Sequence, residues 1–288
     1  MTSTRLATER ACSWEVLARK AGNVCPEREY ADLTVDDFLN SAAAIAPVLE
    51  QAPQTSLGQT ILRAIQATRR VVTTNTNLGI VLLLAPLATA SLNAPLHEGL
   101  AEVLAKTTVA DARDAYTAIR LANPGGLGSA ASQDVAGEPT LTLHDAMALA
   151  PDRDDIALQY VTDFQLVFES ADNLARHAKE FGNIERAIVA THLDLLASRI
   201  DSLIARKLGA IESRKVQEAA MSVSEAGDLA TPAAAKAYRE FDAMLRAANH
   251  ARNPGTTADL IAAALFVALR EGLISTELPF AWPEHPFG

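Results

Sequence analysis

The sequence predicts an all-α fold, in a single multi-helix, bundle-like domain that spans residues 1–288. Hydrophobic residues make up 49% of the chain, and that share is dominated by Ala and Leu, which lose little side-chain freedom in a helix. Signals for the start of a helix recur from one end of the chain to the other, whereas the alternating pattern of a half-buried strand is hard to find. These observations favour one helical domain over a mixed fold.

Three helices in the first half of the chain are predicted from the polar residues that precede them. Thr34 stands before an apolar stretch and Asp37 lies three positions later, which is the pattern of a capping box. Ser56 and Thr108 stand before similar stretches, where a hydroxyl oxygen can accept a hydrogen bond from a free backbone N–H group. The helices that follow are expected over residues 35–50, 57–70 and 109–122.

The most hydrophobic run of the chain, residues 78–92, is predicted to be a buried core helix. Pro86 interrupts this run, which falls short of the roughly 20 apolar residues that a helix needs to cross a bilayer. In the second half, apolar residues repeat every three or four positions over residues 187–208, which predicts a helix with one buried stripe. Two further helices, over residues 232–251 and 257–271, are expected on either side of an Asn-Pro-Gly turn.

Two stretches are expected to lack helices. Residues 123–143 begin with Asn-Pro-Gly-Gly-Leu-Gly and form a glycine-rich connection, which is either a loop over an active site or a connector between two halves of the bundle. Residues 276–288 contain three prolines and three aromatic residues, a composition that predicts irregular chain packed on the surface.

The charge balance and the cysteine count narrow the classes of partner. A formal net charge of −10 argues against sequence-independent binding of nucleic acid, which depends on many Lys and Arg contacts to phosphates. It leaves room for a phosphorylated small molecule at a local cluster of basic groups or helix N-termini. The polar first ten residues do not resemble a signal peptide, and Cys12 and Cys25 are too few for a disulfide framework. We therefore expect a cytoplasmic protein that binds neither nucleic acid nor membrane.

Four segments carry polar residues and glycines where a helical core does not need them. The first contains Lys20 and Gly22, and the carboxylates of Asp32, Asp36 and Asp37 follow it. Carboxylates so close together could direct their oxygens to one Mg²⁺ ion. In the simpler interpretation they are solvated acids at the start of a capped helix.

The second segment reads Asn75-Thr76-Asn77-Leu78-Gly79 and stands directly before the apolar run. Asn and Thr side chains can cap the helix, Gly79 allows a close approach of the backbone, and the open N–H groups can receive a phosphate. Capping alone explains only one of these residues. We therefore interpret the segment as a phosphate-binding turn.

The third and fourth segments each combine an acid with basic groups or with a glycine turn. Asp201 lies beside the apolar stripe of its helix, where an unpaired carboxylate is costly, so a cation is expected next to it. That cation is either a metal ion or a side chain of the same segment, Arg206 or Lys207. In the fourth segment Gly255 opens a helix and Asp259 lies in its first turn, which suits a phosphate with a divalent cation between them. Capping by the two threonines that follow the glycine is the simpler alternative.

These four segments, in this order and at these intervals, resemble the motifs of the triphosphoribosyl-dephospho-CoA synthases that serve citrate lyase and malonate decarboxylase. The resemblance spans nearly the whole chain. The family's Lys-Pro-Gly-x-Val stretch and the acids after it are matched by Lys20, Gly22, Val24, Asp32 and Asp36. Its Asn-Thr-His-Lys-Gly is matched by Asn75, Thr76 and Gly79. Its Asp-Thr-Asn-Leu-Leu-His-Arg-Gly-Gly is loosely matched by Asp201, Ile204 and Gly209. Its Pro-Gly-Gly-Ser-Ala-Asp-Leu is similar to Pro254, Gly255, Ala258, Asp259 and Leu260.

The chain also departs from the family pattern. Asn77 and Leu78 stand in place of a His-Lys pair, Ala21 replaces a Pro, and Arg206 replaces a later His. The loss of one Lys and two His removes possible partners for phosphate and for proton transfer. In these features the chain is similar to a divergent branch of the family.

The resemblance implies an all-helical transferase that uses ATP as a substrate, Mg²⁺ as a cofactor, and dephospho-CoA or another acceptor. The implied reaction moves the triphosphoribosyl group of ATP to the 2′-hydroxyl of 3′-dephospho-CoA and releases adenine, which yields a prosthetic-group precursor. The carboxylates expected to act in catalysis are Asp32, Asp36 and Asp201. The carboxylates expected to hold Mg²⁺ are the same three and Asp259. The residues expected to bind substrate are Lys20, Gly22, Asn75, Thr76, Asn77, Gly79, Arg206, Lys207 and Gly255.

Two alternatives remain open from the sequence. The first is an enzyme of the same fold that acts on another acceptor in cofactor biosynthesis, such as a carrier of one-carbon units, and Asn77 and Leu78 favour it. The second is a helical binding protein without activity, which would bind neither metal nor nucleotide.

Overall fold

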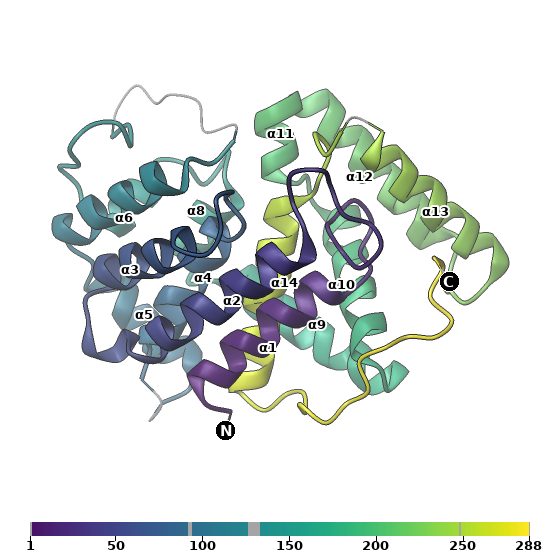
Figure 1. The fold of residues 1–288 in the computed structure, drawn as a ribbon, viewed down its shortest axis with the longest axis horizontal. Helices are drawn as coiled ribbons and strands as arrows, with labels where there is room; N and C mark the ends of the chain where they lie inside the picture. Colours follow the sequence, from purple (N-terminus) through teal and green to yellow (C-terminus); the bar gives the residue numbers. More distant parts are fainter. Residues whose placement is uncertain (1, 92–93, 126–132, 248, 288) are drawn as a thin grey trace.

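The computed structural model describes residues 2–91, 94–125, 133–247 and 249–287, and over these ranges the chain is all-helical, as predicted (Figure 1). The described residues form fourteen α-helices and one 3-10 helix, and their only β-type pairings are two isolated bridges. The elements of the first half are α1 (Thr4–Leu17), α2 (Val35–Glu50), η1 (Ala52–Gln54), α3 (Leu57–Arg69), α4 (Leu78–Thr89), α5 (Leu96–Ala105) and α6 (Val109–Ala122). The elements of the second half are α7 (Leu143–Met147), α8 (Asp155–Val161), α9 (Gln165–Phe181), α10 (Ile184–Ser198), α11 (Ser202–Leu208), α12 (Ala210–Glu225), α13 (Pro232–Arg246) and α14 (Gly255–Arg270).

Helix α14 is the centre of the molecule. All its residues from 260 to 270 are buried, and a helix that is apolar on every face belongs inside a core. It packs against α1, α4, α9 and α10, and Figure 1 shows it in the middle of the fold. The largest cluster of buried apolar side chains surrounds it and includes the apolar helix α4. The prediction of a buried core helix for the apolar run is confirmed, with Pro86 inside α4.

A second and smaller core lies between α10, α12 and α13. It contains Val189, Val216 and Phe241, and the tail that follows α14 closes it with Trp282. In Figure 1 these helices lie on one side of α14, and α3, α5 and α6 lie on the other side. The two sides share α14 and α10, so the molecule forms one all-α domain.

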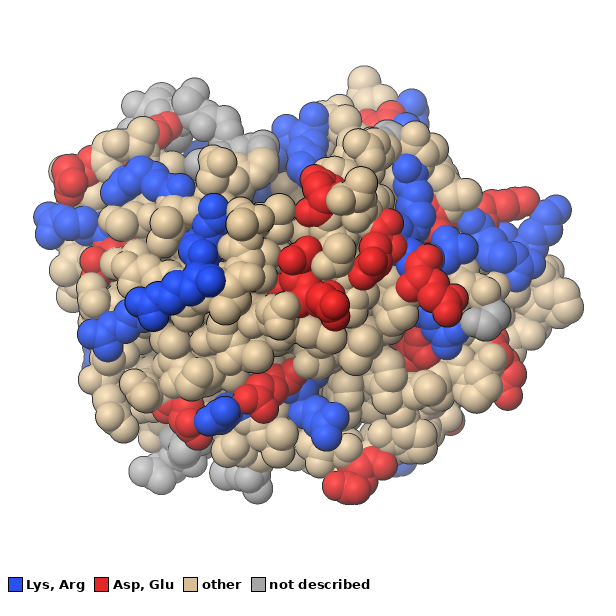
Figure 2. Space-filling view, viewed as in Figure 1, with Lys and Arg blue, Asp and Glu red and all other residues tan. Residues whose placement is uncertain are grey.

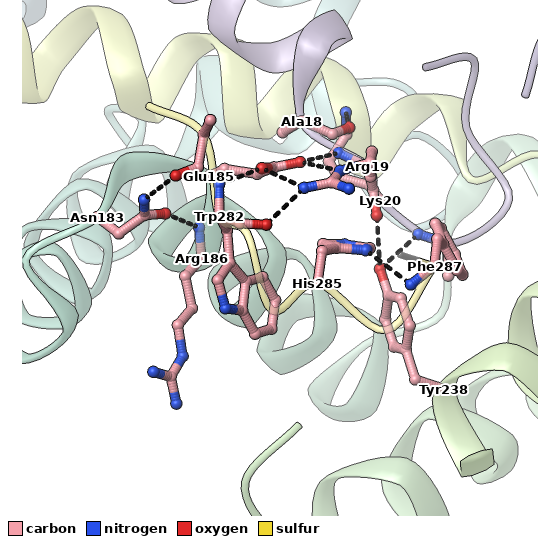
Figure 3. Close-up of polar contacts among 12 residues, drawn as sticks. Ala18, Arg19, Lys20, Asn183, Glu185, Arg186, Tyr238, Trp282, His285 and Phe287 are labelled. Carbon is pink, nitrogen blue, oxygen red and sulfur yellow. Dashed lines mark hydrogen bonds and ion pairs between the residues drawn. The ribbon is translucent and has the colours of Figure 1, made fainter. Parts of the chain in front are cut away.

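Polar contacts fasten the tail and the segment after α1 to this second core (Figure 3). The Glu185 carboxylate accepts hydrogen bonds from Arg19 Nε at 2.7 Å and Arg19 Nη2 at 2.9 Å, and from the Trp282 N–H at 2.8 Å. The Tyr238 hydroxyl donates to the Arg19 carbonyl at 3.0 Å and accepts from the Ala21 N–H at 2.9 Å. Burial alone raises the pKa of Glu185, but the hydrogen bonds from Arg19 and Trp282 outweigh it and lower the pKa. The backbone that follows α1 is therefore held firmly in place.

The predicted helix starts are confirmed where the signal is local. Thr34 and Asp37 form both bonds of a capping box at α2, and Thr108 forms a second box at α6. Ser56 caps α3 as expected.

Three predicted boundaries need correction. The helix expected over 187–208 is two helices, because the chain is extended at residue 199 and the carboxylate of Asp201 caps the new helix α11. The helix expected over 232–251 ends at Arg246 as α13. The helix expected over 257–271 starts two residues earlier, at Gly255 of α14.

The two stretches expected to be irregular differ in how far the structure describes them. In the glycine-rich connection over 123–143, residues 126–132 lie outside the described residues, and Leu143 begins α7. Residues 271–287 follow α14 without a helix. Among the described helices, none combines the length and the hydropathy that a membrane span requires.

Candidate active site

A cavity of about 840 Å³ lies where the starts of α4 and α14 meet the loop before α2. Residues of α1, α2, α6, α7, α8 and α11 also line it. This volume falls within the range of about 300–1,000 Å³ that is typical of small-molecule sites. Figure 2 shows Lys and Arg side chains over α11, and Asp and Glu side chains over the loop before α2. Basic side chains of α11 and the acidic side chain of Asp32, in the loop before α2, both line the cavity.

The structure brings most of the predicted site residues to this cavity. The predicted residues that line it are Asp32, Asn75, Thr76, Asn77, Gly79, Arg206, Lys207, Gly255 and Asp259. The predicted residues that are not part of its lining are Lys20, Gly22, Asp36 and Asp201.

The turn before α4 leaves backbone N–H groups at the start of a helix without partners in the described part of the chain. The Asn75 side-chain oxygen accepts a hydrogen bond from the Leu78 N–H at 3.1 Å, and the Thr76 hydroxyl shares one with Ser41 of α2 at 2.6 Å. None of the described residues accepts a hydrogen bond from the N–H groups of Gly79 or Ile80. Open N–H groups at a helix N-terminus, together with the helix dipole, attract phosphate.

Asp259 of α14 stands directly beside this turn. A Cβ atom at position 79 would lie only 2.0 Å from Asp259 Oδ2, so glycine alone leaves room for the carboxylate. Asp259 faces the cavity but is otherwise enclosed by protein, and this burial raises its pKa well above the usual value. The nearby carboxylates of Glu15, Asp201 and Asp154 raise the pKa further. A cation in the cavity would relieve this accumulation of negative charge.

The basic wall of the cavity comes from α11. Arg206 pairs with the carboxylate of Asp154, the N-cap residue of α8, at 2.7 Å. Burial lowers the pKa of Lys207, and the charge of Arg206 lowers it further, while Asp201 and Asp32 act in the opposite direction. Both basic side chains lie on the cavity wall, and Lys207 has no ion-pair partner among the described residues.

Lys20 and Gly22 shape the site from behind its wall. The Lys20 side chain is fully buried and pairs with Glu15 of α1 at 2.9 Å. Glu15 in turn lines the cavity, so Lys20 holds a carboxylate there. Gly22 has a φ of +75°, and a Cβ atom there would approach Leu245 and Pro254 to 3.0 Å or less.

Asp36 and Asp201 have other surroundings. Asp36 is exposed in the first turn of α2, whose capping box uses Asp37. Asp201 is 3% exposed and accepts hydrogen bonds from the Ile204 N–H at 3.0 Å and from the N–H and hydroxyl of Thr257, both at 2.8 Å. Asp201 therefore ties α11 to the start of α14, and Arg206, one of its expected partners, is paired with Asp154 instead.

Sequence reasoning missed several residues of the cavity wall. It assigned no role to Glu15, Asn23, Asp154 and Tyr116, which all line the cavity. A signal for Glu15 exists, because it continues the helical spacing of buried positions 8, 11 and 12 in α1. The other three residues offer no such pattern, since their neighbours in the cavity come from distant parts of the chain.

Comparisons with known proteins identify the family of the chain. Residues 1–277 match the model of the CitG family, described as ATP:dephospho-CoA triphosphoribosyl transferase. No curated protein matches the chain. The chain is also similar to a crystal structure from Archaeoglobus fulgidus that is described as a proposed triphosphoribosyl-dephospho-CoA synthase. The two sequences are 27% identical and the TM-score is 0.64. The match covers 82% of this chain and 100% of that chain. The family match spans all four polar segments that build the cavity, and this chain belongs to the CitG family of ATP:dephospho-CoA triphosphoribosyl transferases.

Proposed function

We propose that this transferase moves the triphosphoribosyl group of ATP to the 2′-hydroxyl of 3′-dephospho-CoA and releases adenine. Membership of the family makes the chain a transferase of the triphosphoribosyl-dephospho-CoA synthase type. One observation carries the finer proposal. The start of α4, with its open N–H groups, and Asp259 line the same cavity, and the basic side chains of α11 line it too.

The triphosphate is assigned to the turn before α4 and to α11. The N–H groups of Gly79 and Ile80 are free to donate to phosphate oxygens. Arg206 and Lys207 add positive charge on the same cavity wall, and charge-assisted bonds to phosphate are stronger than neutral ones.

The carboxylates fit a Mg²⁺ ion that binds together with the nucleotide. Among the described residues, no three His, Cys, Asp or Glu side chains are grouped as a site made of protein alone. Mg²⁺ is commonly held by one or two carboxylates together with substrate phosphates and waters. Of the four carboxylates expected to hold it, Asp32 and Asp259 line the cavity, and we assign the ion to these two. When bound, it would neutralise charge on the triphosphate.

The proposed reaction exchanges one bond at the ribose for another. The 2′-hydroxyl oxygen of the acceptor bonds to C1′ of ATP while the bond from C1′ to N9 of adenine breaks. The electron pair of the broken bond stays on adenine, and the hydroxyl proton ends on the released base. Positive character develops on the sugar in such a transition state. Glu15 and Asp154 are already paired with Lys20 and Arg206, so we assign the stabilisation of this charge to Asp259 on the cavity wall.

Released adenine is the direct test. The protein is incubated with ATP, Mg²⁺ and dephospho-CoA, and adenine and the coupled product are measured by chromatography and mass. We expect both in equal amounts, and a rate at least ~100-fold lower for Asp259→Asn, since lost electrostatic stabilisation typically costs this much. Asp172→Asn, at an exposed position of α9, serves as the matched control. Formation of ADP or AMP without free adenine would overturn the proposal.

A second candidate is the same transfer to another hydroxyl acceptor. Asn77 and Leu78 favour it, because they stand where the family carries His and Lys. The Asn77 amide is turned toward Thr68 of α3, to which it donates a hydrogen bond at 2.9 Å. Adenine release with other acceptors, but not with dephospho-CoA, would select this candidate.

A further inference from the structure

Arg69, the last residue of α3, places a positive charge on the cavity wall. Its Nη1 atom donates a hydrogen bond to the carbonyl of Thr73, which also lines the cavity. The side chain has no other polar partner among the described residues, so no carboxylate there balances its charge. Its Nε and Nη2 atoms are without a partner in the same ranges, and neither atom is buried. These two nitrogen atoms are therefore open to a ligand.

The end of α3 that carries Arg69 lies beside the start of α4. Thr68, the residue before Arg69, accepts a hydrogen bond at 2.9 Å from the side chain of Asn77, the N-cap residue of α4. The open backbone N–H groups follow in the first turn of the same helix. Residues 71–79 contain no basic side chain, so the positive charge beside this turn comes from Arg69.

The hydrogen bond to Thr73 holds the guanidinium group in place before a ligand arrives. A group that is already held loses less conformational freedom when it binds. The remaining donors of a guanidinium group form a planar fork, which matches two oxygens of a phosphate. The start of a helix attracts phosphate as well. A held fork beside a helix start therefore suits one phosphate group that contacts both.

We propose that Arg69 binds a phosphate group of a nucleotide substrate beside the start of α4. The inference rests on the proposed function, because that function brings two nucleotides into the cavity. The phosphate belongs to the triphosphate of ATP or to the pyrophosphate of dephospho-CoA, which present the same oxygens. The next residue, Arg70, is exposed and is not part of the cavity lining, so this role falls to Arg69.

The test measures the affinity of each nucleotide at low and at high salt concentration. Binding to the full chain with Mg²⁺ is followed by titration calorimetry, first for ATP and then for dephospho-CoA in the presence of a non-reactive ATP analogue. Arg69→Gln should weaken the binding of the contacted nucleotide at least ~tenfold at low salt, because a charge-assisted hydrogen bond is lost. The loss should become smaller at high salt, because salt screens the interaction that was removed.

Two further variants connect the effect to this side chain. Arg69→Lys keeps the charge without the fork, and should recover part of the affinity that Arg69→Gln loses. Arg70→Gln removes the same charge one residue later and should bind both nucleotides like the wild-type protein. The comparison between low and high salt is made within each variant, so a change in stability does not hide the effect.

A loss that depends on salt in Arg69→Gln, and is absent in Arg70→Gln, supports the proposal. The nucleotide that shows this loss is the one whose phosphate Arg69 contacts. Unchanged affinity for both nucleotides, or a loss that is the same at both salt concentrations, overturns the proposal and leaves the proposed function intact. An equal loss in Arg70→Gln overturns it too, because the effect would then come from charge in general. A wild-type protein that binds neither nucleotide would overturn both.

Discussion

The close approach of α14 to the start of α4 makes Gly79→Ala a sharp test of the site. The added Cβ atom would lie 2.0 Å from Asp259 Oδ2, 2.5 Å from Asp259 Cγ and 2.7 Å from Ile156 Cδ1. Real Cβ atoms do not come this close, so the Asp259 carboxylate must leave the α4 start. Overpacking of this kind costs ~1–3 kcal/mol, and the better helix propensity of Ala returns up to ~1 kcal/mol. We expect a net loss of about 0–2 kcal/mol, which lowers Tm by at most ~8 °C.

Nucleotide binding should suffer more than stability in this variant. Affinity for Mg²⁺ and ATP, measured by titration calorimetry, should fall at least ~tenfold because the carboxylate and the open N–H groups no longer share one space. Gly137→Ala is the matched control, since its nearest contact would be an ordinary 3.5 Å to the Asp134 carbonyl. If Gly79→Ala bound the nucleotide as tightly as the wild-type protein, the assigned triphosphate site would be wrong.

Three further predictions concern buried charges, all measured by urea unfolding. Burial and nearby carboxylates raise the pKa of Asp259 in the folded chain. At a pH between the unfolded and the folded pKa, the carboxyl group is protonated in the folded chain only. The free energy of unfolding therefore falls as pH rises through this range. Asp259→Asn should therefore be more stable than the wild-type protein at neutral pH and similar below about pH 4, and equal stability at both would contradict this reasoning. Hydrogen bonds from Arg19 help to lower the pKa of Glu185 in the folded chain. The ionised Glu185 therefore stabilises the fold fully above its unfolded pKa of about 4.3, and this stabilisation is lost as pH falls through the folded pKa. Glu185→Gln should cost ~2–3 kcal/mol at neutral pH and less in acid, and a difference from the wild-type protein that is the same at acid and neutral pH would count against this pair. Lys20→Met leaves the buried Glu15 carboxylate unpaired and should lower the free energy of unfolding by ~3 kcal/mol or more. Adding Glu15→Gln to this variant should recover part of that stability. If Lys20→Met were stable but bound ATP poorly, Lys20 would contact the substrate instead.

The helices could be predicted where their signals are local. The boxes formed by Thr34 with Asp37 and by Thr108 with Asp111 each join residues three positions apart, so the sequence shows both partners at once. The break before α11 is different. The cap is local here too, because Asp201 accepts from the Ile204 N–H three positions later, but the apolar spacing continues across the break and hides it. The contact that also holds Asp201 in place comes from Thr257, 56 positions away.

The same contrast explains the site. The turn over residues 75–79 could be predicted because its caps and its glycine are neighbours in sequence. Lys20 belongs to an equally clear motif, yet it is not part of the cavity lining, and its ammonium group pairs with the carboxylate of Glu15 in the preceding helix. The partner of Arg206 lies 52 positions away at Asp154, and no spacing in the sequence indicates that pair. Motifs identified the segments, and the packing of distant segments decided which side chains face the substrate.

A crystal structure of this chain with Mg²⁺ and a non-reactive ATP analogue tests the central claim most directly. We predict the triphosphate against the N–H groups of Gly79 and Ile80, with Arg206 and Lys207 beside it and the metal ion between the phosphates and Asp259. A nucleotide bound outside this cavity, or a triphosphate far from the start of α4, would contradict the account.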